Sequence, residues 1–496
     1  MAGIHWVFCL DFGTESASTF SLNQQSTSST RTTPRGRSWR GFSKRKVQRN
    51  GLTQYFGANI GSNGRDDVDV NVRSSRRDRF SKKEHYLRFK VVAETNVVVD
   101  GFVGWSRFAP RNAVYLLSHF HSDHYQGLNR HFNGGLIYCS QITARLVSSR
   151  LGIDQQYLRP LPLSQRIRME HAVPPTFVTM MDANHCPGAV MALFEVHHGA
   201  DRVSLHLHLG DARCEMESES LFHRSNQPLL RSLYGRIDRL YLDSTYCASK
   251  KVLPRQSDAT QFIADRIESM LSVHGDLVIL IGTYSIGKER ILERVAKHCG
   301  CPIFIDSAKR SIFRAVYGAE DPLNGGVFTD DLSATKVRVV WMRDIAFSTM
   351  RRFKTSDSTK VVGFRPTGWA SKDGNGRRGG DQHVISPRYW PKTKGPPSAS
   401  SMVIYDVPYS EHSSFPELCK FISDLRPKHI VPTVNNWSRS AVQRQIRTLQ
   451  KGMDSFAVTG YRYLPLVEDN GLKQTSITQF ITTQKSQSES LDHDND

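Results

Sequence analysis

Residues 116–128 read LLSHFHSDHYQGL, a stretch that places three histidines and an aspartate within six positions. His119 and His121 lie two apart, so in an extended segment their side chains leave the same side of the backbone. Asp123 and His124 follow where a helical pattern begins, and a turn there can direct them toward a neighbouring point. Imidazole and carboxylate together suit zinc or similar divalent ions. The stretch predicts a metal site at a strand end, since histidines on an ordinary loop would have to gather by chance.

Ligand-type residues recur at the ends of later strand-like runs. His185 follows TFVTMM in DANHCPGAVM, Asp211 follows a strand and a glycine in LHLGDAR, and His412 follows an apolar run in YSEHSS. Each position alone is weak evidence, because a histidine after a strand is most often an ordinary loop residue. Their recurrence after the first cluster predicts one metal centre assembled from distant segments. His206 and His208 alternate on one strand, and we expect a structural role for both.

The composition of the 496 residues favours a polyanionic partner. The net charge is +19, and residues 1–90 alone contain 17 Lys and Arg against 7 Asp and Glu. A basic surface attracts phosphates and releases their counterions, so nucleic acid is the expected partner. No apolar run reaches the roughly 18 residues that span a bilayer, and we expect no membrane partner. The eight cysteines form no CxxC pair, which favours a reducing compartment over a disulfide scaffold.

The first 85 residues are rich in Ser, Thr, Arg and Gly and have few apolar anchors, so we expect them to be disordered. SKRKVQR (43–49) and SSRRDRFSKK (74–83) are typical of nuclear import or DNA-contact segments. The same Ser- and Arg-rich, acid-poor composition is typical of an organellar transit peptide. We expect a nuclear location, with a mitochondrion or plastid as the alternative.

From about Tyr86 the chain alternates short β-rich runs with helical patterns, which is typical of an α/β protein. DATQFIADRIESMLSVHG (258–275) predicts an amphipathic helix. LVILIGTYS (277–285) and KERILERVAKHCG (288–300) predict a strand, a loop and a helix in succession. Residues 370–400 are rich in Gly, Pro and Arg and predict a loop, and regular patterns fade after Pro465.

Six motifs make the chain resemble the metallo-β-lactamase superfamily and, more narrowly, its β-CASP DNA cross-link repair nucleases. The motifs are LSHFHSDHYQGL, DANHCPGAVM, LYLDSTYC, GTYSIGKER, FRPTGW and PYSEHSS, and the resemblance covers Val91 to Pro465. It implies an αββα sandwich interrupted by a β-CASP module. The expected organisation is a disordered basic region (1–85), a first sandwich part (86–246), a β-CASP insert (247–400), a closing sandwich part (401–465) and a disordered tail (466–496).

The resemblance also implies how the ligand candidates divide between two metal ions. His119, His121, His185 and Asp211 match the first site, while Asp123, His124 and His412 match the second, with Asp211 bridging. The resemblance implies one or two Zn²⁺ ions, with Mg²⁺ or Mn²⁺ an alternative at the second site, and catalytic roles for Asp211, Asp123, His124 and Asp243. Asp243 matches an acidic position that shapes the site, and Asp100 matches one that ends an early strand and orders the loops.

A phosphate needs cationic or hydroxyl partners near these ions. TYSIGK supplies Tyr284, Ser285 and Lys288 at a strand-to-helix turn, where free N–H groups favour anions. Taken alone, SIGK reads equally well as a plain glycine turn. RPTGW adds Arg365 and Thr367, and Ser410 lies beside His412. Their placement near the metals is implied by the resemblance.

The reading that combines these features is a metal-dependent, 5′-phosphate-dependent 5′-to-3′ exonuclease on single-stranded DNA, acting in interstrand cross-link and damage repair. A structure-selective DNA endonuclease is one alternative. An RNA-processing β-CASP nuclease is another, but those relatives carry a further histidine after the final strand, where this chain has Val434 and Asn435. A non-catalytic scaffold would be expected to have lost ligands. Leu209 and Ala212 differ from the residues that are usual beside Asp211 in the family motif, although neither change removes a ligand.

A last motif lies in the tail, where QTSITQFI (474–481) resembles the short peptide that docks onto sliding clamps. Gln474, Ile477 and Phe480 would be its anchors, because one helical turn brings Ile477 and Phe480 to the same face. Ile481 stands where an aromatic residue is usual, so we expect weak binding. A chance match in a polar tail is the alternative.

Overall fold

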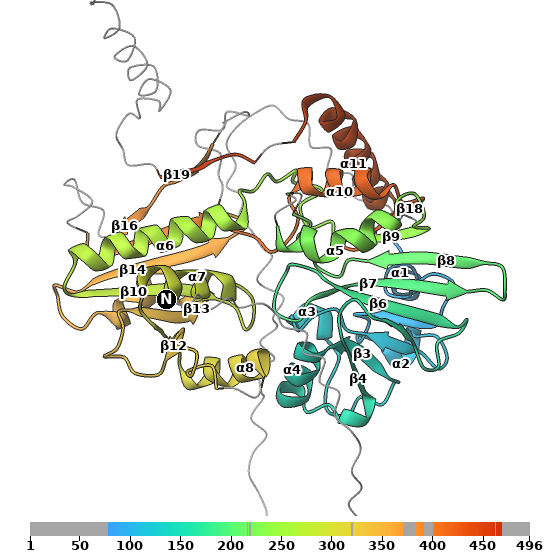
Figure 1. The fold of residues 1–496 in the computed structure, drawn as a ribbon, viewed down its shortest axis with the longest axis horizontal. Helices are drawn as coiled ribbons and strands as arrows, with labels where there is room; N and C mark the ends of the chain where they lie inside the picture. The colour runs from blue at the N-terminus through green and yellow to red at the C-terminus, as the bar shows by residue number, and fades with distance from the viewer. Residues whose placement is uncertain are drawn as a thin grey trace, which may run out of the picture. The chain divides into compact units, whose positions relative to one another are not determined.

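The computed structural model describes residues 78–215, 217, 220–318, 321–370, 382–390, 400–461 and 463–468 (Figure 1). The segments SKRKVQR and QTSITQFI, with Gln474, Ile477 and Phe480, lie outside these residues. Within the described ranges no helix has both the length and the apolar composition needed to cross a membrane.

Two sheets pack face to face in the half of the molecule that contains the first cluster. Valines and leucines of the first sheet meet Val178, Met180 and Phe194 of the second in a dry core between them. The first sheet is parallel, with the order β1 (Val97–Val99), β2 (Val114–Leu116), β3 (Ile137–Ser140) and β4 (Leu158–Leu161). The second has the order β18 (His429–Pro432), β9 (Arg239–Leu242), β8 (Val203–His208), β7 (Val190–His197), β6 (Thr176–Asp182) and β5 (Arg166–Arg168).

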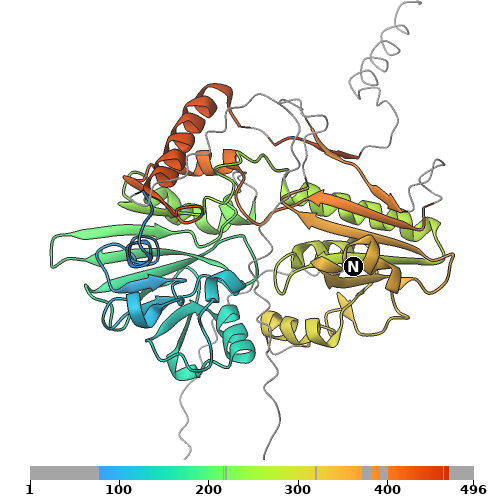
Figure 2. The ribbon, with the colours of Figure 1, turned by 180° about the vertical axis from the view of Figure 1, so that it is seen from behind.

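Helices cover the outer faces of both sheets. Leu146 and Val147 of α4 (Gln141–Leu151) pack on the four-stranded sheet. Leu418 of α10 (Phe415–Leu425) and Leu449 of α11 (Arg439–Thr459) pack on the six-stranded sheet together with α5 (Leu221–Ser232), and Figure 2 shows α10 and α11 in orange to red. The layers therefore run helix, sheet, sheet, helix, in agreement with the mixed α/β sandwich predicted from the sequence.

A separate seven-stranded sheet is built from residues between β9 and β18. Its strands are parallel except β16, and β10 is buried along its whole length, as its unbroken apolar run predicts. The order is β12 (Phe328–Thr329), β11 (Ile303–Phe304), β13 (Val337–Trp341), β10 (Leu277–Thr283), β14 (Lys360–Thr367), β17 (Met402–Pro408) and β16 (Arg388–Trp390).

Helical segments cover both faces of this sheet. The helices α6 (Gln256–Val273) and α7 (Glu289–Cys299) pack on one face. Ile345 and Met350, from η3 (Met342–Asp344) to α9 (Phe347–Met350), cover the other, followed by η4 (Arg351–Phe353). The helix α8 (Ser307–Tyr317) contacts α4, and β15 (His383–Ile385) pairs with β19 (Leu466–Glu468). The helix over 258–275 and the strand, loop and helix of 277–300 are confirmed.

Four limits differ from the sequence prediction. The strand β19 pairs with β15, so the segment predicted to be disordered from residue 466 begins with a strand. The strand β17 pairs with β14 from Val361↔Met402 to Thr367↔Pro408, so the predicted domain limit at residue 400 separates two neighbouring strands of one sheet. The strands β15 and β16 lie within the predicted loop 370–400, because HVI and RYW are short β-formers between Gly- and Pro-rich flanks.

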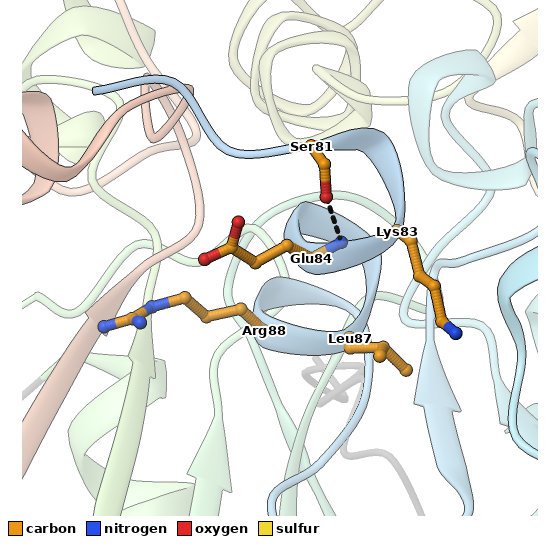
Figure 3. A pocket seen from close by; sticks show the side chains of 5 residues that line it. All are labelled: Ser81, Lys83, Glu84, Leu87 and Arg88. Carbon is orange, nitrogen blue, oxygen red and sulfur yellow. Dashed lines mark hydrogen bonds between the residues drawn. The ribbon is translucent and has the colours of Figure 1, made fainter. Parts of the chain in front are cut away.

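Order also begins before the predicted Tyr86. The helix α1 (Lys82–Phe89) starts at the N-cap Ser81, whose hydroxyl accepts a hydrogen bond from the Glu84 amide at 3.1 Å. Figure 3 shows this cap at a surface pocket lined by Ser81, Lys83, Glu84, Leu87 and Arg88. Phe89 is buried on the opposite side of the helix, which attaches the segment to the sandwich.

Candidate metal centre

The predicted ligands meet where four strands end. His119 and His121 follow β2, and Asp123 and His124 belong to the short helix α3 (Ser122–Tyr125) that comes next. His185 follows β6, Asp211 follows β8, and His412 follows β17 of the seven-stranded sheet. The groups of ligand atoms that lie within 4.8 Å of one another are His119–His121–His185–Cys186, His119–His124–Asp211 and His185–Asp211–His412. Three sheets therefore contribute to one cluster: the two sheets of the sandwich and the seven-stranded sheet.

Asp211 lies at the centre of this cluster. Its Oδ2 is 3.1 Å from His124 Nε2, 3.7 Å from His119 Nε2 and 3.8 Å from His185 Nε2. A carboxylate within reach of histidines from both predicted sites can be shared by two ions.

The carboxylate of Asp123 lies 3.6 Å from His124 Nε2, but its side chain is 78% exposed. It is the one predicted ligand that belongs to none of these groups. Six of the seven predicted ligands therefore meet in one cluster, and Asp123 stands at its solvent side.

Each clustered histidine uses its second ring nitrogen to hold its orientation. Metal-binding histidines in proteins commonly donate this N–H to a carboxylate, a carbonyl or a hydroxyl. The pairs are His119 Nδ1 with Ser118 Oγ (3.0 Å), His124 Nδ1 with Asp100 Oδ2 (2.8 Å), His185 Nδ1 with the Glu411 carbonyl (2.7 Å), His412 Nδ1 with Asp243 Oδ2 (2.8 Å) and His121 Nε2 with the Ile286 carbonyl (3.3 Å). The donor set and its outer hydrogen bonds fit divalent metal ions.

Asp100 and Asp243 hold ligands in place. Asp100 is buried, and besides His124 it accepts hydrogen bonds from the Ser118 amide and hydroxyl at 2.8 and 2.7 Å. Asp243 accepts the Ala212 amide at 3.1 Å in addition to His412, and it accepts the Thr245 hydroxyl at 2.7 Å. Neither carboxylate belongs to the ligand groups, so the structure places Asp243, predicted as catalytic and site-shaping, behind His412.

Burial and mutual repulsion keep most of these imidazoles neutral. Burial and the neighbouring His185 lower the pKa of His121 to about 3, and burial holds the pKa of His119 well below its usual value. Burial also opposes protonation of His412, but the carboxylates of Asp243 and Asp211 outweigh it and raise its pKa to about 9. Since a metal binds only the neutral imidazole, binding at His412 releases a proton.

His206 and His208, for which we expected structural roles, are buried in β8. His208 stacks on Tyr241 with ring centroids 5.1 Å apart, and its Nδ1 accepts the Gly210 amide at 3.0 Å. Burial lowers the pKa of both imidazoles to about 4. These contacts support the turn that leads from β8 to Asp211.

The phosphate candidates lie near the same strand ends, but they differ in exposure and in the partners that they already have. Tyr284 follows β10 with its side chain 51% exposed, and Ser285 lies beside it. The Thr367 hydroxyl at the end of β14 accepts the Trp369 amide at 3.3 Å, and the Ser410 hydroxyl accepts the His412 amide at 3.0 Å. Arg365 pairs with Asp406, which also binds Arg388 at 2.9 Å, so one carboxylate is shared by two guanidinium groups and the group of three keeps one positive charge.

Lys288 is buried, and its partner Glu411 was missed in the sequence. Its ammonium lies 3.2 Å from Glu411 Oε2, and its amide donates to Glu411 Oε1 at 2.6 Å. Glu411 directly precedes the ligand His412, and its own carbonyl holds His185. The pair thus connects the loop after β10 to the metal centre. The only sequence signal for it was a carboxylate directly before the predicted ligand His412.

Cys186 was also missed. Its thiol belongs to the group with His119, His121 and His185, directly after the last of these in the sequence. Burial holds its pKa well above the usual range, so the thiol is protonated. Adjacency to His185 in DANHCPG was the signal that could have found it.

The chain is similar to known DNA repair proteins. Residues 322–438 match a family model described as DNA repair metallo-beta-lactamase. The chain is 33% identical over 375 residues to DNA cross-link repair 1A protein of Homo sapiens, covering 74% of this chain and 32% of that protein. It is 34% identical to DNA cross-link repair protein SNM1 of Arabidopsis thaliana (65% and 61%) and 33% identical to 5′ exonuclease Apollo of Gallus gallus (69% and 63%). The chain thus spans about one third to under two thirds of these relatives.

Among solved structures, an isothiocyanate hydrolase from Delia radicum gut bacteria matches 46% of this chain and 74% of its own at 16% identity. Its TM-score of 0.20 is too low to establish a shared fold.

The Lys288–Glu411 pair yields a stability prediction. Removing one partner of a buried ion pair leaves an uncompensated charge, so Lys288→Met or Glu411→Gln should each lower the free energy of unfolding by about 3–5 kcal/mol. Lys288→Met/Glu411→Gln should lose clearly less than the sum of the single variants, which denaturant unfolding of all four proteins measures. Additive losses would show that the two side chains are not coupled.

Proposed function

We propose that this chain, which matches the DNA repair metallo-β-lactamase family over residues 322–438, is a metal-dependent nuclease of that family which degrades DNA from a 5′-phosphorylated end. Single-stranded DNA is the proposed substrate, and repair of interstrand cross-links and related damage is the proposed role. The observation that carries the proposal is the cluster of five histidines around Asp211, each held by an outer hydrogen bond. The relative named 5′ exonuclease Apollo supports the polarity.

We propose Zn²⁺ as the ion held by His119, His121, His185 and Asp211, because imidazole-rich donor sets suit zinc. His124, His412 and the exposed Asp123 would hold a second divalent ion, for which Mg²⁺ or Mn²⁺ are alternatives. Bound ions would supply Lewis acidity and a hydroxide at neutral pH. The chain itself fixes the imidazole orientations through Asp100 and Asp243. Before an ion binds, the positive His124 and His412 keep the pKa of Asp211 well below its usual range despite burial, so its carboxylate is already ionised.

The seven-stranded sheet is proposed to be the β-CASP module and to bind the substrate end. Tyr284 directly follows β10, Thr367 is the last residue of β14, and Ser410 lies two residues after β17. The loop after β10 also holds His121 through Ile286, and the Ser410 hydroxyl accepts the amide of the ligand His412. Hydroxyls and amides there can receive a terminal phosphate, and the net charge of +19 attracts the polyanion. A structure-selective endonuclease or an RNA nuclease would use the same centre, and the products of digestion distinguish them.

Asp211→Ala should abolish cleavage, because it removes the carboxylate shared by the ligand groups. DNA binding should persist, since the basic surface is unchanged. Incubation of 5′-labelled single strands with the purified proteins and zinc gives the rates, and gel shift gives the binding. Cleavage by Asp211→Ala at the wild-type rate would remove the metal centre from the reaction.

The phosphate pocket predicts a preference of the wild type for 5′-phosphorylated over 5′-hydroxyl strands. Lys288→Ala should lower activity on phosphorylated strands about tenfold or more, since a charge-assisted contact contributes roughly 1.5–3 kcal/mol. The ratio of the two rates is the readout, because loss of the Glu411 pair slows both reactions together. Ser285→Ala leaves the ion pair intact and tests the contribution of a neighbouring hydroxyl in the same pocket to this ratio. An unchanged ratio in Lys288→Ala assigns this lysine to the support of the loop alone.

We also propose that the chain works in the nucleus and docks onto a sliding clamp through Gln474, Ile477 and Phe480. A peptide of residues 471–485 should bind clamp weakly, and Ile477→Ala/Phe480→Ala should remove binding while the full chain keeps its nuclease rate. Titration calorimetry measures the first and strand digestion the second. An absence of heat at high micromolar concentration would refute the docking.

A further inference from the structure

The carboxyl ends of the central strands of the seven-stranded sheet face the metal centre, and we call this side the C-terminal edge of the sheet. The parallel strands β10, β13, β14 and β17 all end at this edge, where the register places Thr283 beside Trp341 and Thr367 beside Pro408. The ligand His412 follows β17, and the Ile286 carbonyl that holds His121 follows β10. Ligands of open α/β sheets bind at the carboxyl ends of the strands, so this edge is where a substrate chain leaving the metals would run.

One aromatic side chain at this edge is exposed to solvent. Trp369 is 69% exposed, more than any other aromatic side chain in the described ranges, and it lies two residues beyond the end of β14. Its ring makes a T-shaped contact with Tyr246 at 5.9 Å, and the Tyr246 ring contacts the ligand His412 at 6.2 Å. A single exposed hydrophobic residue is ordinary, but this one stands two ring contacts from a metal ligand.

The turn that carries Trp369 is fixed by the site. A Cβ at Gly368 would lie 1.8 Å from the Tyr246 hydroxyl, so only glycine permits this close approach. The Tyr246 hydroxyl lies 3.2 Å from the Ser410 hydroxyl, and the Trp369 and Ala370 amides both donate to Thr367 at 3.3 Å. The main chain that carries the indole is therefore fixed beside the metal centre before any ligand arrives, which lowers the entropy cost of binding.

We infer that Trp369 forms a nucleobase subsite, on which a base of the single-stranded substrate stacks close to the phosphate at the metal centre. The inference rests on the proposed nuclease function and adds a contact to a base where that function needs only phosphates. A T-shaped contact with Tyr246 occupies one face of the indole at most, and the exposed remainder offers a planar surface. Stacking on an aromatic ring accepts every base, which suits a strand of any sequence.

The test combines variants of Trp369 with substrates that lack one base. On 5′-phosphorylated single strands, Trp369→Ala should lose about tenfold or more in kcat/KM, the usual effect of one base–aromatic stack, while Trp369→Phe should keep most of the activity. On strands with an abasic site placed in turn at each of the first positions, wild type and Trp369→Ala should become equal at one position. Tyr234→Ala is the matched control, because Tyr234 is 52% exposed and lies before β9, at the end of that strand opposite Asp243.

Binding of a nuclease-resistant phosphorothioate strand separates this inference from the proposed function. If the wild type cleaves no phosphodiester, the function fails, yet the same comparison of Trp369→Ala and abasic strands by fluorescence anisotropy still tests the subsite. A Trp369→Ala protein that cleaves and binds intact and abasic strands in the wild-type ratio at every position would overturn the inference.

Discussion

One buried guanidinium organises the metal centre. Arg213 has no exposed surface, and it lies two residues after Asp211. Removing such a charge from water costs several kcal/mol, so its environment must supply compensating contacts. Glu417 does so at 3.2 Å, and the carbonyls of Ser410 and Pro254 accept from the same group at 2.8 Å each. Pro254 lies just before α6, where the chain enters the seven-stranded sheet, and Ser410 lies where the chain leaves it. The Arg213 side chain therefore joins both connections between the sandwich and this sheet.

The main chain of Arg213 and its neighbour also positions the segments that carry two other ligands. Its amide donates to the Ala183 carbonyl at 2.9 Å, and its carbonyl accepts from the Asn184 side chain at 3.0 Å, directly before His185. The Ala212 carbonyl accepts the Ser413 amide at 2.9 Å, directly after His412. Three ligands from three segments are thus fixed by one residue and its neighbour. This explains why a centre assembled from distant strand ends can hold a defined geometry.

The sequence predicted the parts of the site that depend on local patterns. The ligands could be recognised because each lies at the end of an apolar run, and the sandwich could be recognised from the alternation of short strands. The outward position of Asp123, the burial of Lys288 against Glu411 and the role of Arg213 could not, because each depends on which distant group lies opposite. The position of β17 could not be predicted for the same reason. Its pairing with β14 decides which sheet it joins, and no local sequence pattern indicates that pairing.

The sandwich and the seven-stranded sheet both contribute to the centre. The sandwich segments supply Asp211 and the other imidazoles, whereas the seven-stranded sheet supplies His412 after β17 and holds His121 through the main-chain carbonyl of Ile286 after β10. A main-chain contact places no demand on the neighbouring side chains, so Tyr284 and Ser285 can face the solvent edge without disturbing a ligand. Trp369 is held in the same way, by amides bonded to Thr367 and by the absence of a side chain at Gly368. Because support of the metals and contact with the substrate rest on different atoms of these loops, substrate preference can change while the metal centre stays intact.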